Sequence, residues 1–126
     1  MDIQCVTVVL PEKYTHIAPD GSAIRELLEL EIGGLAHCTL PKGASGTTSH
    51  KTVSELWYCL SGERQIWRRG AKPEVDSLKP GVSVTIPQGT AFQFRNVGPE
   101  PLVVLIATIP KWPGRDEARP EPDYWE

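Results

Sequence analysis

Glycine and proline divide this chain into short segments, and that feature limits the folds open to it. The 126 residues include 11 glycines and 12 prolines, which gather at breaks such as Ser61-Gly62, Lys79-Pro80-Gly81 and Gly98-Pro99. Such groups are typical of turns. The runs between them are rich in apolar, β-branched and aromatic residues and therefore predict strands. The predicted strands are Ile3–Leu10, Glu26–Ile32, Leu35–Leu40, Thr52–Leu60, Arg64–Arg69, Val82–Ile86, Ala91–Arg95 and Leu102–Ile109.

Short strands separated by turns predict an all-β fold, a sandwich or barrel with little or no helix. Only the segment from residue 24 to residue 32 also fits a helix, because its apolar residues at 24, 27 and 28 would share one helical face. The alternation of Leu28, Leu30 and Ile32 with polar residues favours a strand. We therefore predict a strand there.

The predicted organisation is one domain of residues 1–110 followed by a tail of residues 111–126. The length is typical of a single domain. The tail is rich in proline and charged residues, so it predicts an irregular conformation. Its aromatic residues Trp112, Tyr124 and Trp125 indicate that it packs against the domain.

Several features of the sequence bear on the partners and the location of the protein. A net charge of −3 argues against a nucleic-acid partner. Met1–Gln4 has no basic region typical of a secretory signal, and the longest apolar run, Leu102–Ile109, is too short to span a membrane. Cys5, Cys38 and Cys59 form no CxxC pair and no disulfide framework, so we expect free thiols in the cytoplasm.

The first chemically informative stretch is residues 43–62, in which His50 is followed by Glu55 and then by Gly62. On one regular strand, residues five positions apart face opposite sides. His50 and Glu55 can therefore converge only if Lys51–Ser54 forms a turn or a bulge.

The second stretch is residues 81–96. Its proline would end a strand, because proline has no amide to donate, and the following glycine permits the reversal. The residues at fixed offsets here are Gly81, Pro87, Gly89 and Asn96.

Together the two stretches resemble the cupin family. The first cupin motif has a glycine, H-x-H, a glutamate after three or four intervening residues and a glycine seven positions beyond the glutamate, and the second reads G-x5-P-x-G-x2-H-x3-N. The resemblance implies a small single-domain cupin: a double-stranded β-helix, or jelly-roll barrel, into which His50 and Glu55 project.

The sequence departs from the cupin pattern at two positions that bear on metal binding. Cupins that hold a catalytic divalent metal usually do so with three histidines and the glutamate. Here Thr48 stands at the first histidine position and Phe92 at the third, so only His50 and Glu55 remain. Phenylalanine cannot ligate, and a neutral threonine hydroxyl is a poor ligand for a transition metal. We therefore expect the set of metal ligands to be incomplete and predict no metal cofactor.

The substitute ligands that the sequence offers are His37 and its neighbour Cys38. A divalent transition metal, if bound, would then be held by His50 and Glu55, with His37 or Cys38 as the third ligand. Alternation along a strand lets only one of His37 and Cys38 face the interior, and the sequence leaves both choices open.

Two classes of function fit these residues. The first is a barrel that binds a small, partly apolar molecule, with His50 and Glu55 as polar anchors, Thr48 as a hydroxyl donor and Phe92 as an apolar wall. The second is an enzyme. A metal-dependent form would resemble cupin dioxygenases or isomerases, and a metal-free form would resemble cupin cyclases and epimerases, with His50 as the general base and Glu55 orienting its ring.

The run Ile3–Leu10 predicts how the chain assembles. An apolar edge strand without a partner is an aggregation hazard, so it needs a cover. Small cupins often pair through edge strands and exchanged N-terminal segments. The resemblance therefore implies a homodimer.

Overall fold

The structure is a computed structural model, and it describes residues 3–18, 21–40, 42–43, 46–96, 98–114 and 116–125. Parts of several sequence predictions lie outside these residues. They are positions 1–2 of the N-terminal segment, positions 44–45 of the first motif, the side chain of Asn96, and positions 115 and 126 of the tail.

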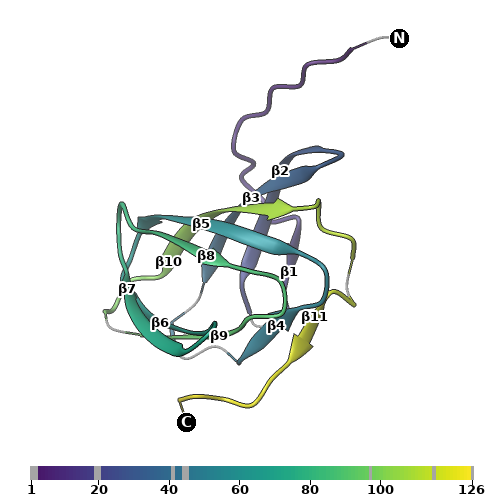
Figure 1. The fold of residues 1–126 in the computed structure, drawn as a ribbon. Coiled ribbons are helices and arrows are strands. Elements are labelled where there is room, and N and C mark those ends of the chain that lie inside the picture. The colour runs from purple at the N-terminus through teal and green to yellow at the C-terminus, as the bar shows by residue number, and fades with distance from the viewer. Residues whose placement is uncertain are drawn as a thin grey trace.

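Two antiparallel sheets face each other, and the described part of the chain contains no helix (Figure 1). The six-stranded sheet has the order β1-β2-β3-β10-β5-β8, and the five-stranded sheet has the order β11-β4-β9-β6-β7. The strands are β1 His16–Ile17, β2 Ala23–Leu30, β3 Gly33–Leu40, β4 Thr48–His50, β5 Ser54–Ser61, β6 Arg64–Arg69, β7 Pro73–Leu78, β8 Ser83–Ile86, β9 Ala91–Asn96, β10 Leu102–Ile109 and β11 Ala118–Pro120. This is the predicted double-stranded β-helix.

Seven of the eight predicted strands are present, with bounds that differ by a few residues at most. The segment that also fitted a helix is β2. The turn between β2 and β3 lies at Glu31–Ile32, and Gly33 and Gly34 belong to β3. A Cβ on Gly33 would lie 2.8 Å from the carbonyl oxygen of Thr108, so glycine lets β3 approach β10 closely.

The prediction of a strand at Ile3–Leu10 is wrong for the single chain. These residues form no β-ladder, and they extend away from the barrel (Figure 1). Ile3 and Val9 are 85% and 87% exposed. β-branched residues favour a strand only where a neighbouring strand supplies hydrogen bonds, and the described residues of this chain offer none here.

Strands also occur in two segments where the sequence predicts none. Residues 70–79, which lie between two predicted strands, contain β7, which pairs with β6 along its whole length. The tail contains β11, which pairs with β4. β7 is almost entirely exposed at the edge of its sheet, so its composition carries little apolar signal.

The core lies between the two sheets and is closed by side chains from both. Trp57 and Cys59 of β5 meet Phe92 and Phe94 of β9, and all four are at most 5% exposed. The Trp57 ring lies 5.1 Å from that of Phe94 and 5.9 Å from that of Phe92. The interior near β4, β5 and β9 is therefore lined by aromatic rings.

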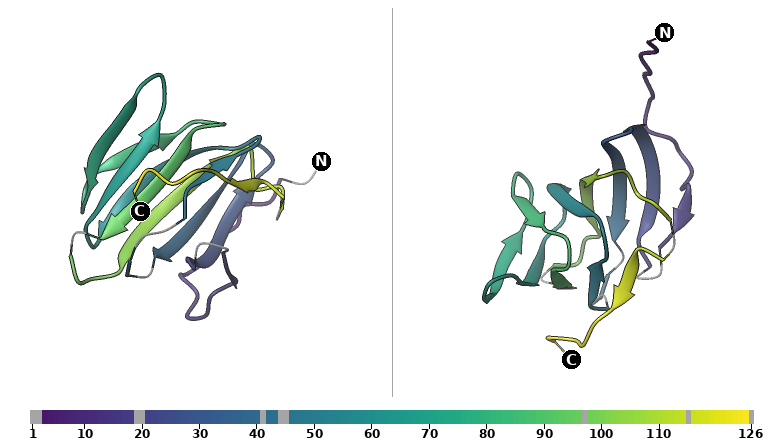
Figure 2. Two further views of the ribbon diagram at one scale, coloured as in Figure 1. Left: turned by 90° about the horizontal axis from the view of Figure 1, so that it is seen from below. Right: turned by 45° about the vertical axis from the view of Figure 1, so that its right-hand side comes forward.

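The C-terminal strap, residues 111–114 and 116–125, crosses the molecule beside the five-stranded sheet (Figure 2). Gln93 Oε1 accepts hydrogen bonds from the backbone amides of Tyr124 and Trp125, at 3.0 and 2.8 Å. The Tyr124 ring stacks on Trp67, with centroids 4.8 Å apart. Asp123 Oδ1 accepts hydrogen bonds from both the amide and the hydroxyl of Thr47. The strap thus packs on the outer side of β6 and β9, as its aromatic residues indicated.

Among the described residues, no helix is long and apolar enough to cross a membrane.

Candidate functional site

His50 and Glu55 come together because the chain turns between them. β4 ends at His50, the chain bends at Lys51–Thr52, and β5 begins at Ser54. The two side chains are both buried, and His50 Nδ1 lies 3.8 Å from Glu55 Oε1. That separation is within the range of an ion pair but is longer than a hydrogen bond. Lys51–Ser54 supplies the change of direction that the spacing requires.

Aromatic rings surround this pair. The His50 ring lies 5.4 Å from the ring of Phe92 and 5.2 Å from the ring of Trp112, both in edge-to-face geometry. Glu55 Oε1 accepts a hydrogen bond of 3.0 Å from Nε1 of Trp57. Aromatic rings therefore contact His50, and an indole N–H donates to Glu55.

Thr48 belongs to the same group of residues. It is half-buried on β4 and is the register partner of Phe92 on β9. Because it lies two positions before His50, it shares the face of β4 that carries His50. Ser49, between them, lies on the other face, where its hydroxyl donates to Glu121 of the strap. The structure thus brings Thr48, His50, Glu55 and Phe92 to one region.

His37 is not part of this group. Its neighbour Cys38 is 2% exposed and belongs to the core, so alternation directs His37 to the outer face of the six-stranded sheet. Burial, followed by the positive charge of Arg25, lowers the pKa of His37. Among the described residues, no three His, Cys, Asp or Glu side chains lie close enough together to hold a metal ion.

The strap adds two residues that sequence reasoning did not place here. Trp112 contacts the His50 ring and is 36% exposed. Glu117 is 4% exposed, and its Oε2 accepts hydrogen bonds from the amides of Thr52, at 2.7 Å, and Val53, at 2.9 Å. The aromatic character of Trp112 signalled packing, whereas an acid in a charged tail carries no signal that it will be buried.

The protonation of Glu117 follows from these contacts. Burial alone would raise the pKa of its carboxyl. The hydrogen bonds from Thr52 and Val53, together with the charge that His50 carries when protonated, outweigh burial and hold the pKa below its usual value. The group is therefore a buried carboxylate at neutral pH.

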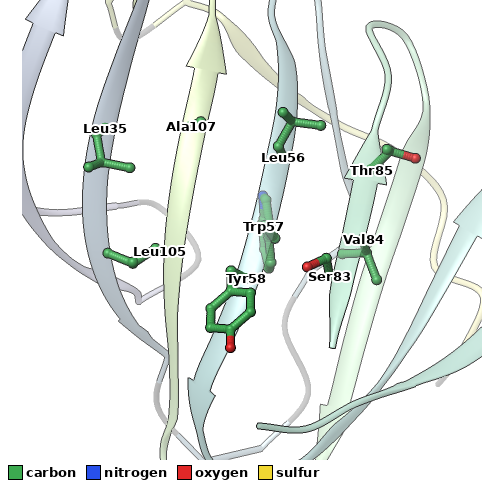
Figure 3. Close-up of a pocket in the computed structure, with 9 residues that line it drawn as sticks. All are labelled: Leu35, Leu56, Trp57, Tyr58, Ser83, Val84, Thr85, Leu105 and Ala107. Atoms are coloured by element: carbon green, nitrogen blue, oxygen red, sulfur yellow. The ribbon is translucent and has the colours of Figure 1, made fainter. Parts of the chain in front are cut away.

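A hollow lies on the outside of the barrel. It is an apolar groove of about 430 Å³ on the outer face of the six-stranded sheet. In Figure 3, Leu35 of β3, Ala107 of β10 and Leu56 of β5 lie side by side across this face, and Leu105 lies beside Tyr58 further along the strands. Leu56 and Tyr58 are 50% and 46% exposed. None of the predicted site residues lines the groove.

Comparisons with known proteins bear on the family and the fold of the chain. Residues 36–108 match the family model described as "Cupin domain". A protein of Methanocaldococcus jannaschii named "Uncharacterized protein MJ1618" is 35% identical over 119 residues, which cover 86% of this chain and 92% of that protein.

Solved structures share the fold at low sequence identity. A protein of Klebsiella pneumoniae with a double-stranded beta-helix domain superimposes with a TM-score of 0.66 at 19% identity, covering 87% of this chain and 92% of that one. Streptomyces PAC13 with uridine gives a TM-score of 0.72 at 12% identity, covering 93% and 92%. A further structure, titled as that of Pac13, a unique nucleoside dehydratase, gives 0.71 at 11% identity, with 92% of each chain covered.

Proposed function

The chain belongs to the cupin domain family, and from this premise we propose that its barrel binds a small, partly apolar molecule at His50 and Glu55. The observation that carries the proposal is the burial of two ionisable side chains, 3.8 Å apart, among aromatic rings. Burying ionisable groups costs stability. Such groups therefore gather where binding or chemistry needs them.

The surroundings suggest the chemistry of the ligand. A carboxylate accepts hydrogen bonds and does not donate them, so Glu55 suits a hydroxyl or amine group of the ligand. The aromatic rings of Phe92 and Trp112 suit a flat apolar part of the ligand. Thr48 adds a hydroxyl at the border between the two. A small molecule with a polar head and a planar body fits these requirements.

The donor set does not fit the usual cupin metal. Phe92 has no donor atom, and its ring packs against His50. His37 lies on the outer face of its sheet, which leaves one imidazole and one carboxylate with the hydroxyl of Thr48. Catalytic transition-metal sites normally have three protein ligands. The proposed function therefore uses no metal.

An enzyme that uses acid–base chemistry without a metal is the second candidate. It is favoured by the same buried pair, because a histidine beside a carboxylate is a common general base. The separation of 3.8 Å would have to shorten for Glu55 to orient the ring. Pac13, which is named a nucleoside dehydratase, shows that the shared fold can serve an enzyme.

Ligand-observed NMR tests the binding proposal. Purified full-length protein is screened by saturation transfer against nucleosides, with uridine first, then sugar acids and small aromatic alcohols. We expect His50→Ala and Glu55→Gln each to reduce the binding of a hit at least tenfold. A hit that binds all variants equally would contradict the proposal. Chemical change of the hit in the same tubes would favour the enzyme.

The chain offers a matched control for this experiment. His16 Nδ1 and Glu26 Oε1 lie 4.0 Å apart on the surface, with side chains 47% and 61% exposed. His16→Ala and Glu26→Gln therefore remove the same chemical groups from a pair that lies outside the barrel. We expect both control variants to bind like the unaltered protein.

We also propose that two copies of the chain associate. The exposed apolar run Ile3–Leu10 and the apolar groove over Leu56, Tyr58 and Leu105 leave two uncovered apolar surfaces on one chain. In a two-fold dimer, the run of one copy can cover the groove of the other, so both apolar surfaces are covered at once.

The location of the protein is a separate proposal. Cys5 is an exposed free thiol, and such thiols persist in reducing compartments, which supports the cytoplasm.

A further inference from the structure

The turn between His50 and Glu55 depends on a residue far away in the sequence. Residues 51–53 form no hydrogen-bonded ladder of their own, since β4 ends at His50 and β5 begins at Ser54. A short connection of this kind can adopt several conformations unless its backbone donors have fixed partners. A different conformation of this turn would change the directions in which His50 and Glu55 point.

One residue of the strap accepts four hydrogen bonds from this turn. Glu117 Oε2 accepts from the amides of Thr52 and Val53, at 2.7 and 2.9 Å. Glu117 Oε1 accepts from the hydroxyl of Thr52, and the Glu117 carbonyl oxygen accepts from the amide of Lys51 at 3.0 Å. All three residues of the turn are therefore tied to Glu117, which is 4% exposed.

We propose that Glu117 is a positioning residue, which holds the turn at Lys51–Val53 so that His50 and Glu55 converge on one ligand. This inference rests on the proposed function for the meaning of the pair, but its evidence is separate. Glu117 lies beyond residues 36–108, the part of the chain that matches the family model. The barrel thus supplies both polar anchors, and the C-terminal strap sets their relative position.

Two readings of Glu117 make different predictions. If the carboxylate only stabilises the fold, its removal lowers the melting temperature and leaves the arrangement of the interior unchanged. If it positions the pair, its removal also changes the environment of the His50 ring. The contact between His50 and Phe92 reports this change, since neither ring lies on the strap.

The test is the nuclear Overhauser effect between the His50 and Phe92 rings in the full-length chain without ligand. We expect Glu117→Ala to reduce this effect to less than half, and Glu117→Gln to retain it, because an amide oxygen still accepts from the turn. Glu121→Ala is the matched control: Glu121 also lies on the strap and bonds β4, through Ser49, but it does not contact the turn. It should leave the effect unchanged. An unchanged effect in Glu117→Ala would overturn the proposal.

A second measurement needs no variant and applies even if Glu117→Ala does not fold. Hydrogen exchange in the unaltered chain reports the amides of Thr52 and Val53. We expect them to be protected at least a hundredfold more than the exposed amides at residues 6–10. Exchange as fast as in that segment would also overturn the proposal. Both measurements are made without ligand, so failure of every tested compound to bind would refute the proposed function alone.

Discussion

Replacing Phe92 by alanine tests whether the interior is packed as described. The ring is 5% exposed and contacts the rings of His50, Trp57 and Phe94, with centroids 5.4, 5.9 and 5.7 Å away. Truncation removes apolar area and leaves a cavity that rigid neighbours on three sides cannot fill. A buried Phe→Ala change of this kind costs about 3–5 kcal/mol. That is a large share of the roughly 5–15 kcal/mol by which a domain is stable.

Urea unfolding followed by tryptophan fluorescence measures this loss. With a slope of about 1–3 kcal/mol per molar urea, the midpoint should fall by about 1 M or more. Leu30→Ala is the control, because Leu30 is 72% exposed and its truncation should change the free energy of unfolding by no more than about 0.5 kcal/mol. If Phe92→Ala moved the midpoint no further than this control, the ring would not be part of the core, and its position beside His50 would be wrong.

Three further predictions address the metal, the assembly and the pH dependence. The double change Thr48→His with Phe92→His should bind a divalent first-row metal far more tightly than the unaltered chain, because four convergent ligands replace two; elemental analysis that finds equally little metal in both would refute the convergence. Deleting residues 1–10 should yield a monomer or insoluble protein in sedimentation analysis, and a stable dimer would refute the role of that segment. Since the pKa of His37 is lowered by burial and by Arg25, unfolded chains bind the proton more readily, so stability should fall as the pH drops below 6.5. The slope of the unfolding free energy against pH should become shallower in His37→Gln, and an unchanged slope would assign the effect to another group.

The fold was largely predictable because its strands are separated by strong turn signals. Leu102–Ile109 and Arg64–Arg69 have the predicted bounds, since each is a β-rich run between breaks. The errors occur where a strand depends on its neighbours. Ile3–Leu10 has strand composition but no partner in the described chain. β7 has the composition of a loop, yet β6 supplies a ladder for it.

The candidate site was predictable in part. The five-residue spacing of His50 and Glu55 required a turn, and the structure contains one. The role of Phe92 as an apolar wall is consistent with its ring beside His50. The contacts of Trp112 with His50 and of Glu117 with the turn could not be predicted from the sequence, because no local pattern shows which strand a charged tail will cross. The direction of His37 became clear only from the burial of Cys38.

The hydrogen bonds of the strap have a consequence for the order in which this protein matures. Thr52 and Glu117 are 65 positions apart, and Thr47 and Asp123 are 76 apart. During synthesis, His50 and Glu55 leave the ribosome long before Glu117 does. A nascent chain can therefore pair its early strands before Glu117 reaches the turn between these two residues. A chain cut short after β10 would lack the four hydrogen bonds that Glu117 accepts from that turn, and among the described residues only the contacts from the loop after β8 would hold it.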